Sequence, residues 1–143
     1  METLFSVQRG NGELILIVDD EESMLLLARE ILEEQGYRVM VAKDGAEAVE
    51  LYQSHWQEID LVILDLIMPV KDGGQAYLEM KDINPNIKAF FCSGYTHGRI
   101  ITELLEHENL FAVQKPFQNE ELLATVAKIL NSRSNNKSVI PPQ

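Results

Sequence analysis

The stretch Leu14-Ile15-Leu16-Ile17-Val18-Asp19-Asp20 decides the fold class of this chain. Its first five residues form a continuous apolar run rich in β-branched side chains, which is typical of a strand buried on both faces of a parallel sheet. From Ser23 to Gly36 the pattern changes to that of an amphipathic helix, with Gly36 as a suitable stop. The apolar positions at helical spacing are Met24, Leu27, Ile31 and Leu32.

The same alternation of strand and helix repeats four more times. Five such units predict a parallel sheet covered by helices on both faces, with right-handed crossovers. The predicted class is a doubly wound, flavodoxin-like (βα)5 sandwich; its strand order, 2-1-3-4-5, is general for such folds and is not worked out from these residues. Further strands are predicted over residues 37–42, 61–64, 87–92 and 111–113, and helices over 46–52, 74–80, 100–105 and 120–130.

Length and composition limit the kind of protein this can be. With 143 residues, 45% of them hydrophobic, the chain suits one domain, expected over residues 13–130. Residues 1–12 are expected to be a tail or linker, and residues 131–143 a disordered tail. The formal charge of −11 would repel nucleic acid and anionic membranes. Because no apolar run could span a membrane and no secretion signal opens the chain, we expect a cytoplasmic protein without membrane insertion or direct nucleic-acid contact.

Polar residues stand where the predicted strands end. Asp19 and Asp20 follow the first strand, Asp65 the third, Ser93 the fourth and Lys115 the fifth. Because ligands of doubly wound sheets bind beyond the carboxyl ends of the strands, these five residues should converge on one surface. Each pair of carboxylates at ~4 Å would repel by ~4 kcal/mol at an effective dielectric near 20. A cation is therefore expected among them.

Oxygen ligands of this kind favour Mg²⁺ or Mn²⁺. A metal, a lysine and a hydroxyl around one carboxylate can stabilise phosphoryl charge while Asp65 attacks phosphorus. Taken singly, each residue has a plainer explanation: an acidic helix cap, a turn serine or a surface lysine. Their joint placement at successive strand ends favours a phosphoryl site.

Four sequence blocks resemble the signatures of response-regulator receiver domains. The blocks are residues 17–21 (IVDDE), 64–69 (LDLIMP) with Asp72-Gly73 following, 92–95 (CSGY) and 114–117 (QKPF). The resemblance covers roughly residues 13–130. It implies a switch in two-component signalling that is not a conventional enzyme but catalyses its own phosphorylation and dephosphorylation. The implied partners are a sensor histidine kinase or histidine phosphotransfer protein as donor, an unidentified downstream protein, and a second copy if the chain forms homodimers.

The resemblance also implies roles for individual residues. Asp65 would be phosphorylated, and Asp20, Asp65 and the backbone carbonyl of Ile67 would bind Mg²⁺. Asp19 would act mainly through a metal-bound water. Ser93 and Lys115 would each contact a phosphoryl oxygen.

One position departs from the family pattern. Receiver domains usually carry Tyr or Phe three residues before the lysine, where this chain has Ala112. Phe111 lies one residue early, and one step along a strand places a side chain on the opposite face. Phe111 is therefore not expected to replace the missing aromatic.

Alternative interpretations stay open at this point. Residues 10–13 (GNGE) resemble the linker that joins a histidine kinase to an attached receiver, so the chain could be a receiver excised from a hybrid sensor kinase. A Mg²⁺-dependent phosphohydrolase with an aspartyl-phosphate intermediate needs a second acid two residues after the nucleophile, where this chain has Ile67. A degenerate receiver used only for docking would not need the acidic residues, the serine and the lysine together.

Overall fold

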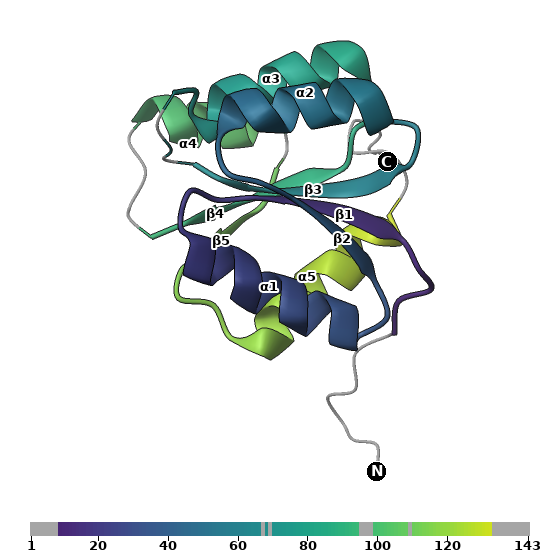
Figure 1. Ribbon diagram of the computed structural model, residues 1–143. Helices are drawn as coiled ribbons and strands as arrows, with labels where there is room; N and C mark the ends of the chain where they lie inside the picture. The colour runs from purple at the N-terminus through teal and green to yellow at the C-terminus, as the bar shows by residue number, and fades with distance from the viewer. Residues whose placement is uncertain (1–8, 67, 69, 95–98, 109, 133–143) are drawn as a thin grey trace, which may run out of the picture.

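The computed structural model describes residues 9–66, 68, 70–94, 99–108 and 110–132, and for residues 99–101 it describes the backbone. In this part of the chain the strands form one parallel sheet in the order β2-β1-β3-β4-β5, which confirms the predicted class and order. Helices α2, α3 and α4 cover one face and α1 and α5 the other (Figure 1). The elements are β1 Leu14–Val18, α1 Glu22–Glu34, β2 Arg38–Ala42, α2 Gly45–His55, β3 Ile59–Asp65, α3 Gly73–Ile83, β4 Ala89–Ser93, α4 Arg99–Glu108, β5 Ala112–Gln114 and α5 Asn119–Leu130.

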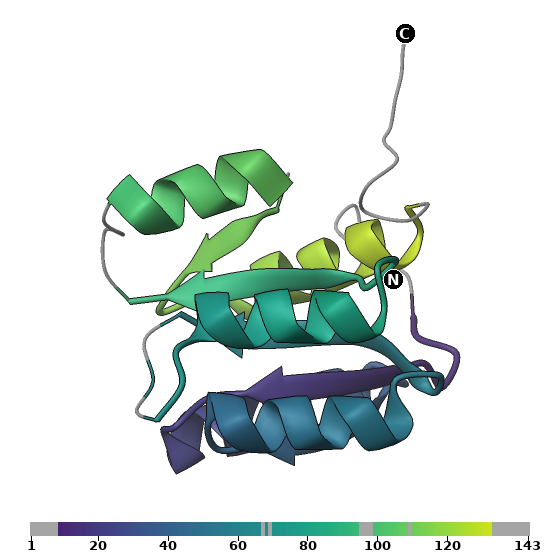
Figure 2. The ribbon, with the colours of Figure 1, turned by 90° about the horizontal axis from the view of Figure 1, so that it is seen from above.

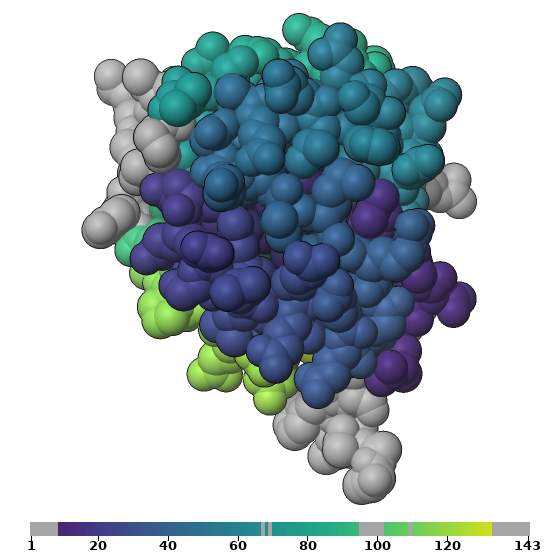
Figure 3. Space-filling view, viewed as in Figure 1, coloured from purple at the N-terminus to yellow at the C-terminus, as the bar shows by residue number. Residues whose placement is uncertain are grey.

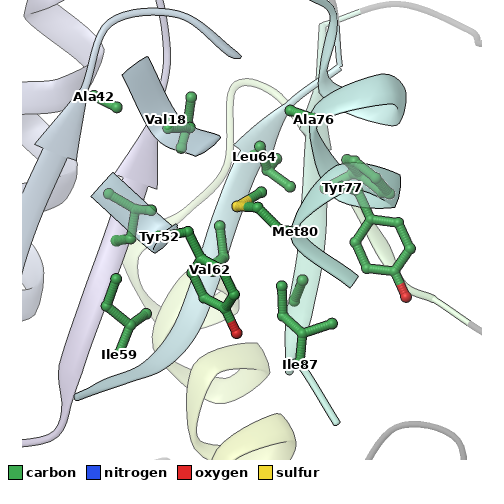
Figure 4. Close-up of a cluster of buried hydrophobic side chains, with 14 of the residues drawn as sticks. Val18, Ala42, Tyr52, Ile59, Val62, Leu64, Ala76, Tyr77, Met80 and Ile87 are labelled. Carbon is green, nitrogen blue, oxygen red and sulfur yellow. The ribbon is translucent and has the colours of Figure 1, made fainter. Parts of the chain in front are cut away.

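Strand β1 contributes side chains to both hydrophobic layers of the core. All five of its residues are buried. Leu16 and Val18 pack in the layer under α2 and α3, whereas Ile15 and Ile17 pack toward α1 and α5. Figure 4 shows the first layer, where side chains from β1, β3, α2 and α3 point toward one another. Burial of one such side chain contributes about 1.5–3 kcal/mol, so the strand joins the two layers firmly.

The side chains that α1 buries differ from the predicted set at Leu27. Its buried residues include Leu25, Ala28 and Leu32, but Leu27 is 46% exposed. The assignment of Leu27 to the inner face was therefore wrong. Consecutive leucines at positions 25–27 offer several registers, because each residue turns the helix by about 100°, and the sheet takes the register of Leu25. The space-filling view shows α1 and α2 together covering much of this side of the molecule (Figure 3).

Residues just before β1 contact the turn between α1 and β2. The amide of Gly10 donates to the carbonyl of Gln35 (2.8 Å), and the amide of Gly12 donates to that of Gly36 (2.9 Å). Gly36 adopts φ +107°, the left-handed conformation expected where it ends the helix. Residues 10–12 therefore run along the domain surface. Of the two expected tails, residues 1–8 and 133–143 lie outside the described part of the chain.

Among the described residues, no helix has both the length and the apolar character needed to cross a bilayer. The single cysteine of the chain belongs to the hydrophobic core. Cys92 is a buried free thiol in β4, and burial raises its pKa to about 12. Such a thiol stays protonated and unreactive at neutral pH.

The start of α3 is pressed against the end of β3, which gives a testable expectation for Gly73. A Cβ at this position would lie 2.2 Å from the carbonyl oxygen of Asp65 and 3.0 Å from Cα of Leu66. Because both atoms are backbone, Gly73→Ala should lower the free energy of unfolding by about 2 kcal/mol. Urea unfolding followed by the fluorescence of Trp56 measures this.

A matched control is Gly94→Ala, since a Cβ there meets no atom of the described residues within 4 Å. That variant should change stability by less than about 0.5 kcal/mol. Equal stabilities of the two variants would contradict the close approach at Gly73.

Candidate functional site

The parallel register brings the predicted site residues to one edge of the sheet. Val18, the last residue of β1, pairs with Leu64, so Asp19 and Asp65 follow at the same level. Asp65 pairs with Cys92, and Ser93 pairs with Gln114, the residue before Lys115. In Figure 2 the carboxyl ends of β3 and β4 point to the left side of the view.

Three carboxylates gather at this edge. Asp19, Asp20 and Asp65 each offer one oxygen, and these oxygens lie within 4.8 Å of one another. Asp19 and Asp65 are buried, at 5% and 7% exposure, whereas Asp20 faces solvent. Clustered carboxylate oxygens that open toward water are the donors that Mg²⁺ or Mn²⁺ prefers. The residues present therefore fit such a metal; Ile67, expected to add its carbonyl, lies outside the described residues.

Lys115 supplies a positive charge inside the cluster. Its ammonium lies 2.8 Å from Oδ2 of Asp19 and 3.6 Å from Oδ2 of Asp65, and its side chain is only 13% exposed. Burial alone would lower the pKa of Lys115, but the hydrogen bond that Lys115 donates to Asp19 and the charges of Asp19 and Asp65 outweigh it and raise the pKa. The lysine therefore stays charged at neutral pH and offsets part of the repulsion.

Both oxygens of Asp19 are engaged within the protein. Oδ2 accepts from Lys115, and Oδ1 accepts from the backbone amide of Glu21 at 2.9 Å. These two contacts fix the carboxylate in one orientation. Ser93 is held next to them, because its carbonyl accepts the backbone amide of Lys115 at 2.7 Å and its side chain is buried.

An open pocket of about 520 Å³ lies over the cluster. It is large enough for a phosphoryl group with its metal and waters. Met24 lines this pocket, although sequence analysis assigns it no site role, because apolar residues at helical spacing are typical of a core face. The pocket is lined by Asp20, Glu21, Met24, Asp65, Gly94, Lys115 and Pro116.

Strand β5 lacks an inward aromatic near the site. Ala112 is exposed, and Val113 is the buried residue of this strand. Phe111, the first residue of the predicted strand, lies one residue before the observed start of β5, and its ring is exposed beneath the ammonium of Lys128 at 4.6 Å. Phe111 therefore does not fill the position that Ala112 leaves small.

The loop between β3 and α3 holds a residue in an unfavourable conformation. Val70 has φ +70° and is 81% exposed. The left-handed region costs an L-residue roughly 1–2 kcal/mol, and a β-branched side chain is among the least suited to it. Exposure means that no packing offsets this cost.

Replacing Val70 with asparagine should therefore stabilise the protein by about 1 kcal/mol, because asparagine enters the left-handed region readily. Thermal unfolding by circular dichroism measures the gain. Val70→Ile keeps the β-branch and serves as the control, with no gain expected. An equal gain in both variants would mean that side-chain polarity or size, and not backbone strain, limits stability here.

Comparison with known proteins identifies the family. A family model described as the response regulator receiver domain matches residues 15–127. The chemotaxis protein CheY of Bacillus subtilis (strain 168) is 35% identical over 118 residues, which cover 82% of this chain and 97% of that protein. The sensor kinase CckA of Brucella abortus (strain 2308) is 31% identical over 119 residues, covering 83% of this chain but only 13% of the kinase.

Solved structures agree with the sequence relatives. The crystal structure of a response regulator receiver protein from Sinorhizobium medicae WSM419 superimposes with a TM-score of 0.76 at 29% identity, covering 86% of this chain and 98% of that one. Its similarity extends over nearly the whole sandwich that carries the acidic edge. The chain belongs to the response regulator receiver domains of two-component signalling.

Proposed function

We propose that this domain accepts a phosphoryl group on Asp65 in a Mg²⁺-dependent reaction and thereby switches the binding of a partner protein. The observation that carries the proposal is the cluster of Asp19, Asp20 and Asp65 with the ammonium of Lys115 between two of them. Receiver domains are signalling domains, and phosphorylation is typical of the family. The reaction would be catalysed by the domain itself.

In this proposal the carboxylate of Asp65 forms a bond to phosphorus as the bond from phosphorus to the donor's imidazole nitrogen breaks. The electron pair returns to that nitrogen, which takes up a proton. Lys115 would pair with one phosphoryl oxygen and the hydroxyl of Ser93 would donate to another. The fixed orientation of Asp19 and its engaged oxygens support a role through a bound water, which leaves direct coordination to Asp20, Asp65 and the carbonyl of Ile67.

Receiver domains bind Mg²⁺ at an acidic pocket, and the described carboxylates have the oxygen donors that this ion requires. Bound Mg²⁺ would neutralise charge on the phosphoryl oxygens. The Mg²⁺-dependent phosphohydrolase considered above is not supported, since the relatives are signalling receivers.

The proposed donor is a phosphohistidine on a sensor histidine kinase or a histidine phosphotransfer protein, which would place the reaction in the cytoplasm. Relatives include both a short chemotaxis protein and a long sensor kinase, so a free-standing regulator and a receiver excised from a hybrid kinase both have counterparts. We take residues 13–130 as the functional unit.

Incubation with Mg²⁺ and acetyl phosphate, followed by mass spectrometry, tests the proposal. One phosphoryl group should appear on the peptide that contains Asp65, and EDTA should prevent its appearance. Phosphate on another residue, or uptake that EDTA does not change, would overturn the assignment.

A further inference from the structure

The ion pair between Lys71 and Glu79 joins the loop that follows Asp65 to helix α3, and neither residue lines the pocket over the candidate site. We propose that this pair is a positioning element for the metal site: it holds Lys71 and Asp72 in place and, through Gly73, the backbone of Asp65, so that the carboxylate of Asp65 faces the metal. The inference rests on the proposed function, because it concerns the metal of the same site. It adds two residues that touch neither the metal nor the phosphoryl group.

The pair is well formed and spans the loop and the helix. The ammonium of Lys71 lies 2.6 Å from Oε1 of Glu79, and Gln75 donates to the other oxygen at 3.3 Å. The hydrogen bond from Lys71 lowers the pKa of Glu79. Glu79 lies in the second turn of α3, so the contact ties the loop to the body of the helix.

Backbone packing holds the same stretch of loop from the other side. The carbonyl oxygen of Lys71 faces the start of α2 so closely that a Cβ at Gly45 would lie 2.2 Å from it. Asp72 then caps α3 by accepting the amide of Gln75 at 2.8 Å. Lys71 is therefore fixed through both its side chain and its carbonyl.

These contacts hold the backbone of Val70 in a conformation that its own side chain disfavours. A residue stays in a sparsely populated conformation only when its surroundings determine that conformation. Val70 is exposed and has φ +70°, so its own side chain contributes no packing that would hold it there. The contacts of its neighbour Lys71 are the described restraints that can do so.

The far end of the loop connects directly to the acceptor residue. The amide of Gly73 donates to the carbonyl of Leu66 at 3.0 Å, and Gly73 packs against the carbonyl of Asp65. The loop is thus closed on itself between residues 66 and 73. A displacement of Lys71 and Asp72 would therefore reach the backbone of Asp65 through Gly73.

A positioning role and a purely electrostatic role predict opposite changes in the Mg²⁺ affinity of one variant, Lys71→Glu. Lys71→Glu removes the pair and makes the region more negative. If only charge matters, the variant should bind Mg²⁺ more tightly; if positioning matters, it should bind Mg²⁺ more weakly. The side chains are 22% and 37% exposed, and a pair of this exposure contributes little, so the loss of affinity should be about two- to fivefold.

The experiment is a Mg²⁺ titration followed by amide NMR, without any phosphodonor. Lys71→Glu and Glu79→Lys should each weaken Mg²⁺ binding, and the double variant with the charges exchanged should return to within about twofold of the wild type. Arg29 and Glu33, an ion pair on α1 at 3.1 Å, provide the matched control. Exchanging these two charges should leave Mg²⁺ affinity unchanged.

Tighter binding by Lys71→Glu, or a double variant no better than the single ones, would overturn the positioning role. Asp20→Asn separates this failure from failure of the proposed function. If the wild type binds Mg²⁺ and Asp20→Asn does not, the metal site stands and only the ion pair loses its role. If the wild type binds no Mg²⁺, the proposed function and this inference both fall.

Discussion

Replacing Asp65 with asparagine should abolish phosphoryl uptake and at the same time make the metal-free protein more stable. The carboxylate of Asp65 is buried and has ligand oxygens of Asp19 and Asp20 within 4.8 Å, with one lysine to offset three negative charges. Asparagine keeps the shape and removes one charge. The relief of repulsion should exceed the lost attraction to Lys115 and raise the free energy of unfolding by about 1–2 kcal/mol.

Urea unfolding in EDTA measures the stability, and acetyl phosphate with mass spectrometry measures the uptake. Saturating Mg²⁺ should reverse the order of stability, because it stabilises only the protein that binds it. The control is Asp60→Asn at the other end of the same strand, where an amide oxygen can still accept the backbone amide of Leu14. A less stable Asp65→Asn protein in EDTA would show that repulsion does not dominate the site.

Replacing Lys115 with methionine should have the opposite effect on stability. Its ammonium is the one described cation in contact with both Asp19 and Asp65, and all three side chains are largely buried. Removing one partner of a buried ion pair leaves uncompensated charge and costs about 3–5 kcal/mol. We expect a loss of this size in EDTA, measured by urea unfolding.

Mg²⁺ should restore most of the stability of Lys115→Met, since the ion replaces the missing positive charge. The variant should also bind Mg²⁺ more tightly than the wild type, because no lysine repels the ion. Lys43→Met removes an exposed lysine and should be close to neutral in both assays. A destabilisation that Mg²⁺ does not reduce would point to lost packing by the lysine side chain in place of lost charge.

The fold could be predicted from the sequence because β1, β3 and β4 carry continuous apolar runs that end at a chemically distinct polar residue. Parallel pairing then forces those ends together, as it does for Asp19 and Asp65. Residue roles in phosphoryl transfer remain predictions, since they depend on a metal and a donor.

Features that depend on three-dimensional proximity could not be predicted. Leu27 was assigned to the buried side of α1 and is exposed, because neighbouring leucines allow more than one helical register. Lys71 and Glu79 are eight residues apart, across a loop and a helix start, and no spacing rule pairs such residues. The left-handed conformation of Val70 runs against the preference of its own side chain, so local sequence predicts something else.

The hydrogen bonds of Gly10 and Gly12 to the α1–β2 turn also fix where a domain fused before Arg9 would join the sheet. They anchor the chain at the amino ends of the strands, opposite the carboxylates. In a longer protein, a phosphohistidine domain fused before Arg9 would start on the far side of the sheet. Its tether would have to run the length of a seven-residue strand, roughly 20 Å or more, before the histidine could reach Asp65. Shortening such a tether would therefore block transfer within one chain while leaving transfer between chains intact.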